Sequence, residues 1–220
     1  TLVSYSGTES TVTIPDGVRV IGENAFKNND YVLNVICPDS LEEIGYRAFH
    51  DCNNLQSVSL PETLKVINEG AFYYCENLKT LGHTGDGVLP KGLTTMGVKA
   101  FYFCKALEGD LVIPEGVTSL SAGIFYNAYA LTSITIPDTV TSMDANGDQF
   151  ANCTAVTSVT LSKNLTELPD NKYRLSRQSK GVYLQAEYLG SYHPLKASRA
   201  PRFALYRLRQ RGSATLRRWL

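Results

Sequence analysis

Few residues of this chain could do chemistry, and three of them are consecutive. His50, Asp51 and Cys52 place a thiol beside an imidazole, the pairing by which enzymes activate a cysteine nucleophile. Such a pair works only where the two side chains lie within hydrogen-bonding reach, so the local fold decides whether it is a site. The only other histidines are His83 and His193.

Two short segments are candidates for binding an ion or a phosphate. Asp144, Asn146 and Asp148 place oxygen-bearing side chains at alternate positions, as a calcium loop does. The twelfth position, however, holds Ala155 instead of the glutamate that closes such a loop. The glycine-rich segment 81–88 is not followed by Gly-Lys-Ser/Thr, so it is not a phosphate loop. We therefore expect no metal, no cofactor, no small-molecule substrate and no enzymatic activity.

A six-residue phrase recurs along the chain and defines its organisation. It first occurs as Ile-Gly-Glu-Asn-Ala-Phe, and the first three phenylalanines are 23 residues apart. The phrase spans residues 21–26, 44–49, 67–72, 96–101 and 120–125. A fixed period of this length predicts a stacked repeat array, in which the glycine-rich segment 81–88 is an insertion that forms a surface loop.

Each repeat also contains a short strand that ends at a proline. The segments before the prolines alternate apolar and polar residues and are rich in β-branched side chains, which is typical of strands. Proline has no N–H and marks the point where strand pairing stops. The prolines are Pro15, Pro38, Pro61, Pro90, Pro114 and Pro137, and Ser162 takes the seventh position. Parallel pairing between repeats predicts a sheet with about 4.8 Å between strands.

The phrase itself is predicted to form a turn on the opposite side of each repeat. Gly, Asn, Ser or Asp follows the apolar residue that opens the phrase, and these residue types are favoured at helix N-caps. We therefore expect Ala-Phe to fill one short helical turn in most copies. The predicted fold class is an α/β repeat solenoid with a parallel sheet on the concave face and short helical turns on the convex face.

Stacking places equivalent side chains above one another in buried columns. The predicted members of these columns are Phe26, Phe49, Phe72, Phe101, Phe125 and Phe150, with Cys52, Cys75, Cys104 and Cys153 three residues further on. In this phase Cys52 points into the core, whereas His50 lies on the solvated convex turn. The sequence therefore argues against a catalytic Cys/His pair and favours buried, reduced cysteines.

The repeat closely resembles the BspA-like class of leucine-rich repeats. That class is marked by L-x-S-I-x-I-P followed by V-x-x-I-G-x-x-A-F-x-x-C-x-x-L. Residues 131–137 match the first half, and residues 49–55 match the end of the second. The resemblance covers residues 8–170 and implies a non-catalytic cell-surface or secreted protein. It further implies adhesion, with a protein or glycan on a host or neighbouring cell as the partner.

The outward strand positions form the candidate binding surface. They carry mostly small hydroxyls and almost no charge, which suits hydrogen bonding to a partner, although hydroxyl and β-branched residues also simply suit exposed strands. The candidate binding residues are Thr11, Thr13, Asn34, Ser57, Ser59, Thr80, Asp110, Ser133, Thr135, Ser158 and Thr160. Ile36 and Val112 also occupy outward strand positions. Repeat solenoids commonly bind partners on this concave face.

The charge divides the chain into an acidic and a basic part. Residues 1–170 carry nine Lys and Arg against 20 Asp and Glu, whereas residues 171–220 carry 12 against one. We predict a solenoid over residues 1–173 and a basic tail over 174–220. The tail has three interpretations: a binder of nucleic acid or another anionic polymer, a disordered linker, or the product of a frameshift, which we favour. Nucleic acid is therefore not an expected partner.

Two classes of function fit these features. The favoured hypothesis is adhesion or ligand capture on the concave sheet. The alternative is an accessory scaffold that presents a catalytic or carbohydrate-binding domain encoded elsewhere in a longer protein. Residues 2–8 resemble a stretch between earlier repeats, so we expect the chain to be a fragment, and it contains no stretch that is long and apolar enough to span a membrane.

Overall fold

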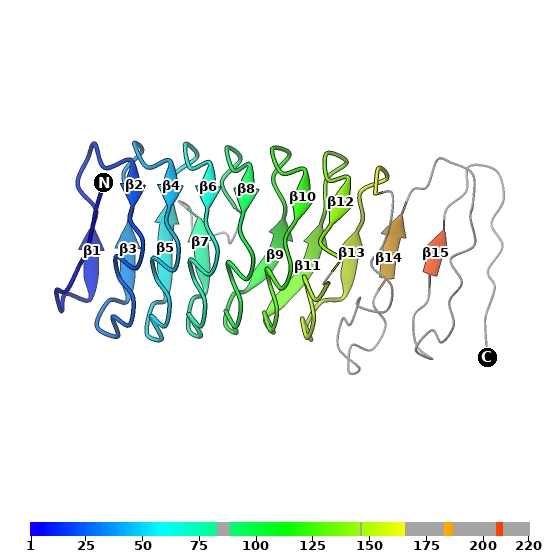
Figure 1. The fold of residues 1–220 in the computed structure, drawn as a ribbon. Coiled ribbons are helices and arrows are strands. Elements are labelled where there is room, and N and C mark those ends of the chain that lie inside the picture. Colours follow the sequence, from blue (N-terminus) through cyan, green and yellow to red (C-terminus); the bar gives the residue numbers. More distant parts are fainter. Residues whose placement is uncertain (83–88, 146, 166–182, 187–205, 209–220) are drawn as a thin grey trace.

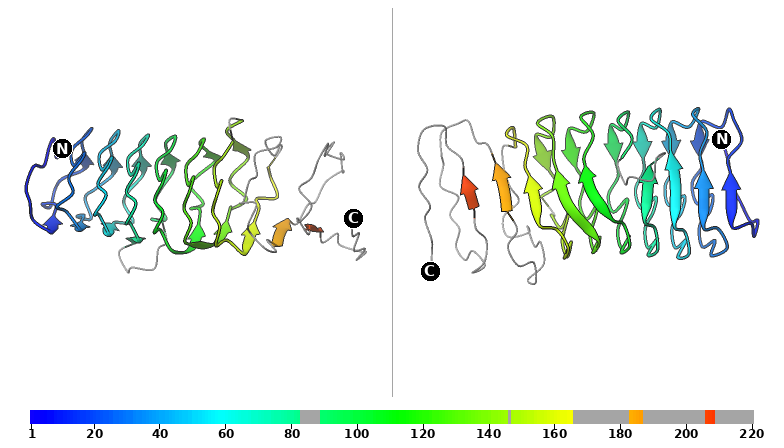
Figure 2. Two further views of the ribbon diagram at one scale, coloured as in Figure 1. Left: turned by 90° about the horizontal axis from the view of Figure 1, so that it is seen from below. Right: turned by 180° about the vertical axis from the view of Figure 1, so that it is seen from behind.

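A computed structural model shows a solenoid whose successive repeats form coils that follow one another along one axis (Figure 1). It describes residues 1–82, 89–145 and 147–165, and the backbone of two further strands at 183–186 and 206–208. Each coil from β1 to β12 has one longer and one short strand on opposite sides (Figure 2). The predicted repeat solenoid with parallel strand pairing is confirmed.

The longer strands pair in parallel in two separate sheets, of order β1-β3-β5-β7 and β9-β11-β13-β14-β15. They are β1 (Thr11–Thr13), β3 (Asn34–Ile36), β5 (Ser57–Leu60), β7 (Thr80–Gly82), β9 (Gly109–Val112), β11 (Leu131–Thr135), β13 (Ser158–Thr160), β14 (Tyr183–Ala186) and β15 (Tyr206–Leu208). Strands β14 and β15 lie within the segment 174–220, and their backbones extend the second sheet. The boundary at residue 173 stays a prediction.

The short strands form a second, parallel set on the other side of the coils. They are β2 (Val20–Ile21), β4 (Glu43–Ile44), β6 (Val66–Ile67), β8 (Thr95–Met96), β10 (Ser119–Leu120) and β12 (Ser142–Met143). They pair in the orders β2-β4-β6-β8 and β10-β12. Within the described residues, β7 does not pair with β9 and β8 does not pair with β10. Strand pairing is thus interrupted on both sides of the solenoid, between the coil of β7 and β8, which contains the insertion, and the coil of β9 and β10.

The turns that contain the phenylalanines are not helical, and the prediction of helical turns is wrong: the described residues form no helix. The reason lies in the hydrogen bonds of the turn. Lys27 N donates to Asn24 O three residues earlier at 3.1 Å, and Phe26 N donates to Ala48 O of the next coil at 2.7 Å. An α-helix needs N–H groups bonded four residues back. Here alternate N–H groups join neighbouring coils instead.

Backbone angles give the second reason. Each of these turns has two residues of positive φ, four apart, which a right-handed helix forbids. The pairs are Asn24 and Asn28, Arg47 and Asp51, Gly70 and Tyr74, Lys99 and Phe103, Gly123 and Asn127, and Asp148 and Asn152. Asn, Asp and Gly tolerate this conformation, but Arg, Lys, Tyr and Phe do so at a cost of about 1–2 kcal/mol each. Stacking between coils therefore overrides the local backbone preference.

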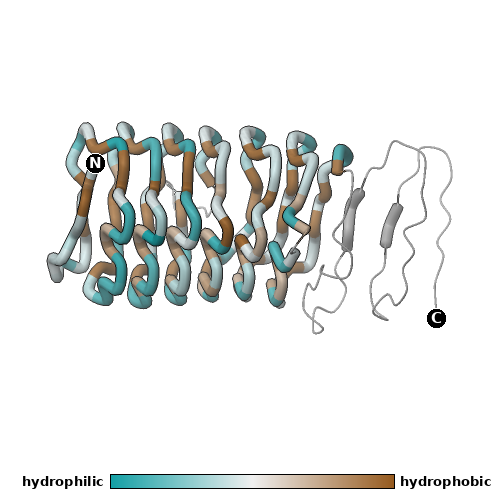
Figure 3. The backbone as a smooth tube through the Cα atoms, in the orientation of Figure 1, coloured by the Kyte–Doolittle hydropathy of each residue, from teal (hydrophilic) through white to brown (hydrophobic). Residues whose placement is uncertain are grey.

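The core lies between the two strand layers and repeats from coil to coil, as the recurring hydrophobic positions in Figure 3 show. Five of the six repeat phenylalanines are 0–1% exposed and Phe150 is 5% exposed. Their rings form one stacked column with centroids 4.8, 5.1, 5.2, 5.0 and 5.8 Å apart from Phe26 to Phe150. The ring of Tyr5 extends the column, 4.9 Å from Phe26.

The cysteines lie beside this column. All five, including Cys37 directly after β3, are buried free thiols. Cys52 Sγ donates to Phe26 O at 3.0 Å and Cys75 Sγ to Phe49 O at 2.9 Å, each reaching the preceding coil. Burial raises the pKa of the Cys52 thiol to about 12, so these groups remain protonated hydrogen-bond donors within the core.

Candidate functional site

The outward side chains of the longer strands β1 to β13 form two sets of rows, one on each sheet, which together we call the long-strand face. Strand pairing aligns the equivalent positions of successive coils, so Thr11, Asn34, Ser57 and Thr80 form one column. The alternate residues of each strand point into the core and are buried. The candidate residues are therefore exposed or half-buried because of strand alternation.

Side chains in the first sheet are joined by hydrogen bonds across the coils. Asn34 Nδ2 donates to Thr11 Oγ1 at 3.4 Å, and Ser57 Oγ donates to Asn34 Oδ1 at 2.7 Å. These bonds orient the amide and the hydroxyls before any partner binds. Pre-oriented polar groups lower the entropy cost of binding.

The second sheet contains the one acidic side chain among the candidate residues. Asp110 Oδ1 accepts hydrogen bonds from Ser133 Oγ at 2.7 Å and Thr132 Oγ1 at 2.8 Å. The bond from Ser133, and then that from Thr132, hold the pKa of Asp110 below its usual value. An exposed, oriented carboxylate on a nearly uncharged face is suited to a cationic group of a partner.

Two aliphatic side chains interrupt the polar columns. Ile36 is 44% exposed and Val112 is 42% exposed, one in each sheet. They are partnered by Thr13 and Ser59 in the first sheet and by Thr135 in the second. Apolar groups inside a polar surface can be desolvated by a partner, which contributes binding free energy.

The structure does not bring all eleven candidate residues onto one sheet. Thr11, Thr13, Asn34, Ser57, Ser59 and Thr80 belong to the first sheet, and Asp110, Ser133, Thr135, Ser158 and Thr160 to the second. The interruption between β7 and β9 separates the two groups, and the insertion that follows β7 lies largely outside the described residues, at 83–88.

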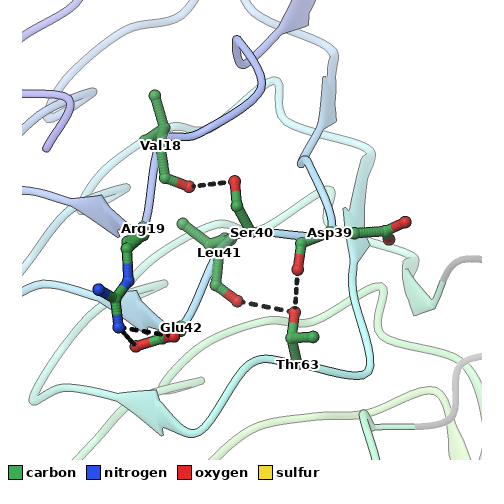
Figure 4. Close-up of polar contacts among 7 residues, drawn as sticks. All are labelled: Val18, Arg19, Asp39, Ser40, Leu41, Glu42 and Thr63. Atoms are coloured by element: carbon green, nitrogen blue, oxygen red, sulfur yellow. Dashed lines mark hydrogen bonds and ion pairs between the residues drawn. The ribbon is translucent and has the colours of Figure 1, made fainter.

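The proline turns at one rim of the coils are joined by their own side chains (Figure 4). Ser40 Oγ donates to Val18 O at 2.9 Å, and Thr63 Oγ1 donates to Leu41 O at 3.0 Å. Each hydroxyl reaches the preceding coil and satisfies a main-chain carbonyl. These rim hydroxyls are therefore engaged in stacking the coils.

An ion pair at the same rim also links two coils. Arg19 Nη2 lies 2.8 Å from both carboxylate oxygens of Glu42, and the two side chains are 67% and 35% exposed (Figure 4). Solvent screens an exposed pair of this kind, so it contributes little to stability.

The consecutive His50, Asp51 and Cys52 do not form a nucleophilic site. The thiol of Cys52 is 1% exposed and bonded to the carbonyl of Phe26. The imidazole of His50 lies on the turn, as expected, where it is partly exposed and stacks on Tyr73 with centroids 4.8 Å apart. Its Nδ1 lies 2.8 Å from Asp51 Oδ2 but outside hydrogen-bonding geometry.

The described residues offer no metal site. They contain no group of three His, Cys, Asp or Glu side chains placed to hold a metal ion. The calcium-like segment 144–148 includes Asn146, which is outside the described residues. In the described part of the chain, no helix has the length and hydrophobicity that a membrane crossing requires.

An aromatic surface on the turn side was missed by the sequence reasoning. Tyr73, Tyr102 and Tyr126 each follow a repeat phenylalanine and stack in a second column, which we call the tyrosine column. Tyr74 and Phe103 stack beside it with centroids 4.5 Å apart. The signal was available, because the position after the phenylalanine is aromatic in three successive repeats.

Comparisons with known proteins identify the repeat. The family model of the BspA type leucine rich repeat region matches residues 4–86 and 83–190, with six copies. A comparison with curated proteins gave no match.

Solved structures share the fold. A leucine rich repeat protein of T. pallidum is 24% identical with a TM-score of 0.61, and the match covers 73% of this chain and 75% of that one. A leucine rich cell surface protein of Faecalibacterium prausnitzii A2-165 is 29% identical with a TM-score of 0.58, over 77% of this chain and 52% of the other. The pneumococcal vaccine antigen PcpA is 21% identical with a TM-score of 0.55, over 80% and 42%.

The chain thus spans about half or less of two of these three proteins. The family match extends over most of the chain's length. This chain belongs to the BspA-type leucine-rich repeat family.

Proposed function

We propose that this chain is a non-catalytic binding region of a cell-surface or secreted protein, which captures a protein or glycan on the long-strand face. The observation that carries the proposal is the alignment of oriented polar side chains across successive coils, with a carboxylate at Asp110. Family membership supports a binding role, and the F. prausnitzii relative, described as a cell surface protein, supports the location.

The chemistry of the face supports recognition without catalysis. Hydroxyls and an amide supply donors and acceptors, and Ile36 and Val112 supply apolar contact. A partner that pairs a cation with Asp110 and covers these aliphatic groups would use every feature of the second sheet. Each such contact orients a partner, and none of them activates a nucleophile or a water molecule.

The test places a carboxylate in the middle of each sheet. Ser57→Glu and Thr135→Glu add a longer, charged side chain to an outward position without touching the core. A charge buried unpaired at an interface should weaken binding by about 2 kcal/mol, or about 30-fold in Kd. Binding is measured on a glycan array and, by flow cytometry, on intact cells.

The matched control is Ser119→Glu on β10, an exposed serine on the opposite side of the coil. Circular dichroism checks that all three variants keep the wild-type fold. We expect binding to fall for Ser57→Glu or Thr135→Glu and to persist for Ser119→Glu. Equal binding by all three variants would exclude the long-strand face as the binding surface.

A further inference from the structure

The tyrosine column crosses the place where both sheets are interrupted. Tyr102 belongs to the turn after β8 and Tyr126 to the turn after β10, and β8 and β10 do not pair. The two rings have centroids 4.7 Å apart and planes 14° from parallel. Tyr73, on the preceding coil, lies 4.9 Å from Tyr102 at 6°. All three rings are half-buried, with part of each open to solvent.

The turns hold these two coils together where the strands do not. Phe103 N donates to Tyr126 O at 2.8 Å, and Phe101 stacks on Phe125 at 5.0 Å. Ser121 Oγ also donates to Met96 O at 2.8 Å, where the equivalent contact in the preceding coil is made by a main-chain N–H. A covalent bond between Tyr102 and Tyr126 would therefore join the coils where strand pairing is missing.

We propose that Tyr102 and Tyr126 form an oxidative cross-linking site, at which a one-electron oxidant joins the two rings as dityrosine. Each phenol gives up one electron and one proton, and the two ring radicals form a carbon–carbon bond between positions ortho to the hydroxyls. The two ortho hydrogens then move to the oxygens, so both phenols are restored. Hydrogen peroxide, activated by a haem peroxidase, takes up the two electrons and two protons and becomes two molecules of water.

Ring stacking makes Tyr102 and Tyr126 a better site for radical coupling than a tyrosine that is merely exposed. Coupling requires two radicals within contact distance, and Tyr102 has tyrosine rings on both sides at 4.9 and 4.7 Å. Tyr31 is 63% exposed but makes no ring contact within the described residues. Competing thiols are withdrawn from solvent: Cys75 and Cys104, in the same coils as Tyr73 and Tyr102, are 0% exposed.

The experiment treats the full chain with horseradish-type haem peroxidase and hydrogen peroxide at low protein concentration. A Tyr129→Phe background leaves Tyr126 as the single tyrosine of tryptic peptide 106–163, and Tyr102 is the single tyrosine of peptide 100–105. We expect the monomer to lose two hydrogen atoms in mass and to yield these two peptides joined. The joined product should also unfold at a higher temperature than the untreated chain.

Variants separate the chemistry from the fold. Tyr102→Phe keeps the ring stack but removes the phenol, and should abolish the product that joins peptides 100–105 and 106–163. Tyr31→Phe is the exposure control and should leave the yield of the joined peptides unchanged. The proposal is overturned if the joined peptides are absent from the treated Tyr129→Phe monomer, if peptide 106–163 is still cross-linked to the same extent in its Tyr102→Phe variant, or if the cross-links require Tyr31.

Discussion

Truncation of one phenylalanine in the middle of the column should destabilise the chain strongly. Phe72 is 0% exposed, and its ring stacks on Phe49 at 5.1 Å and on Phe101 at 5.2 Å. A Phe→Ala change in a core costs about 3–5 kcal/mol, and the loss of two stacked neighbours places Phe72→Ala at the upper end, about 4–5 kcal/mol. Phe72→Leu keeps most of the volume and should cost under about 1.5 kcal/mol.

Phe150 provides the internal comparison. It is 5% exposed and, among the described residues, stacks on one phenylalanine, Phe125, at the longer distance of 5.8 Å. Phe150→Ala should therefore cost about 3 kcal/mol, the lower end of the range. The assay is urea unfolding of each full-length variant, followed by circular dichroism. A cost below about 1 kcal/mol for Phe72→Ala, or equal costs for both alanine variants, would refute stacking as the source of stability.

Three further outcomes are expected. Gly97→Ala would place a methyl group 2.3 Å from Glu69 N, so it should cost about 2–3 kcal/mol in thermal or urea unfolding; a neutral effect would show that the coils are packed less closely. Iodoacetamide should modify Cys75 only as fast as the chain unfolds, because burial raises the pKa of this fully buried thiol well above its usual value; rapid labelling of the native chain, detected by mass spectrometry, would contradict this. Ser133→Ala should raise the pKa of Asp110 towards its ordinary value in a carbon-detected NMR titration. Because the folded pKa is depressed, the carboxylate stabilises the fold above its unfolded pKa and this contribution is lost as pH falls through the folded pKa; an unchanged titration would show that Ser133 does not bond the carboxylate.

The sequence alone was sufficient to predict the periodic features. Pro38 and Pro61, or Phe49 and Phe72, occupy equivalent places because each coil presents the same surroundings to the next. The same periodicity correctly predicted the parallel strands, and β3 and β5 pair in the register that the prolines indicate.

The conformation of the turns could not be predicted in the same way. Local composition favoured helix, but alternate N–H groups bond the neighbouring coil, as Phe49 N does to Ala71 O. Residues such as Arg47 and Lys99 then adopt positive φ, which no local propensity predicts for them. The helix prediction failed because a contact between coils, remote in sequence, determines the backbone.

Predicting the surfaces of the solenoid requires details of single coils, which the repeat period does not contain. The interruption between β7 and β9 arises at a single coil, so no repeat average reveals it. The tyrosine column is visible only when Tyr73 and Tyr102 are recognised as equivalent positions on a turn face. The outward phase of Ser57 and Thr135 was predictable from strand alternation, whereas binding by that face remains a proposal.

The central claim is that equivalent side chains of neighbouring coils stack on one another and stabilise the chain pairwise. Double-mutant cycles with leucine substitutions test it directly by unfolding free energy. The cycle of Phe49 with Phe72, stacked at 5.1 Å, should give a coupling of about 1 kcal/mol. The cycle of Phe49 with Phe125, which lies three coils from Phe49, should give less than about 0.3 kcal/mol. Equal couplings in the two cycles, or none in the first, would contradict the account.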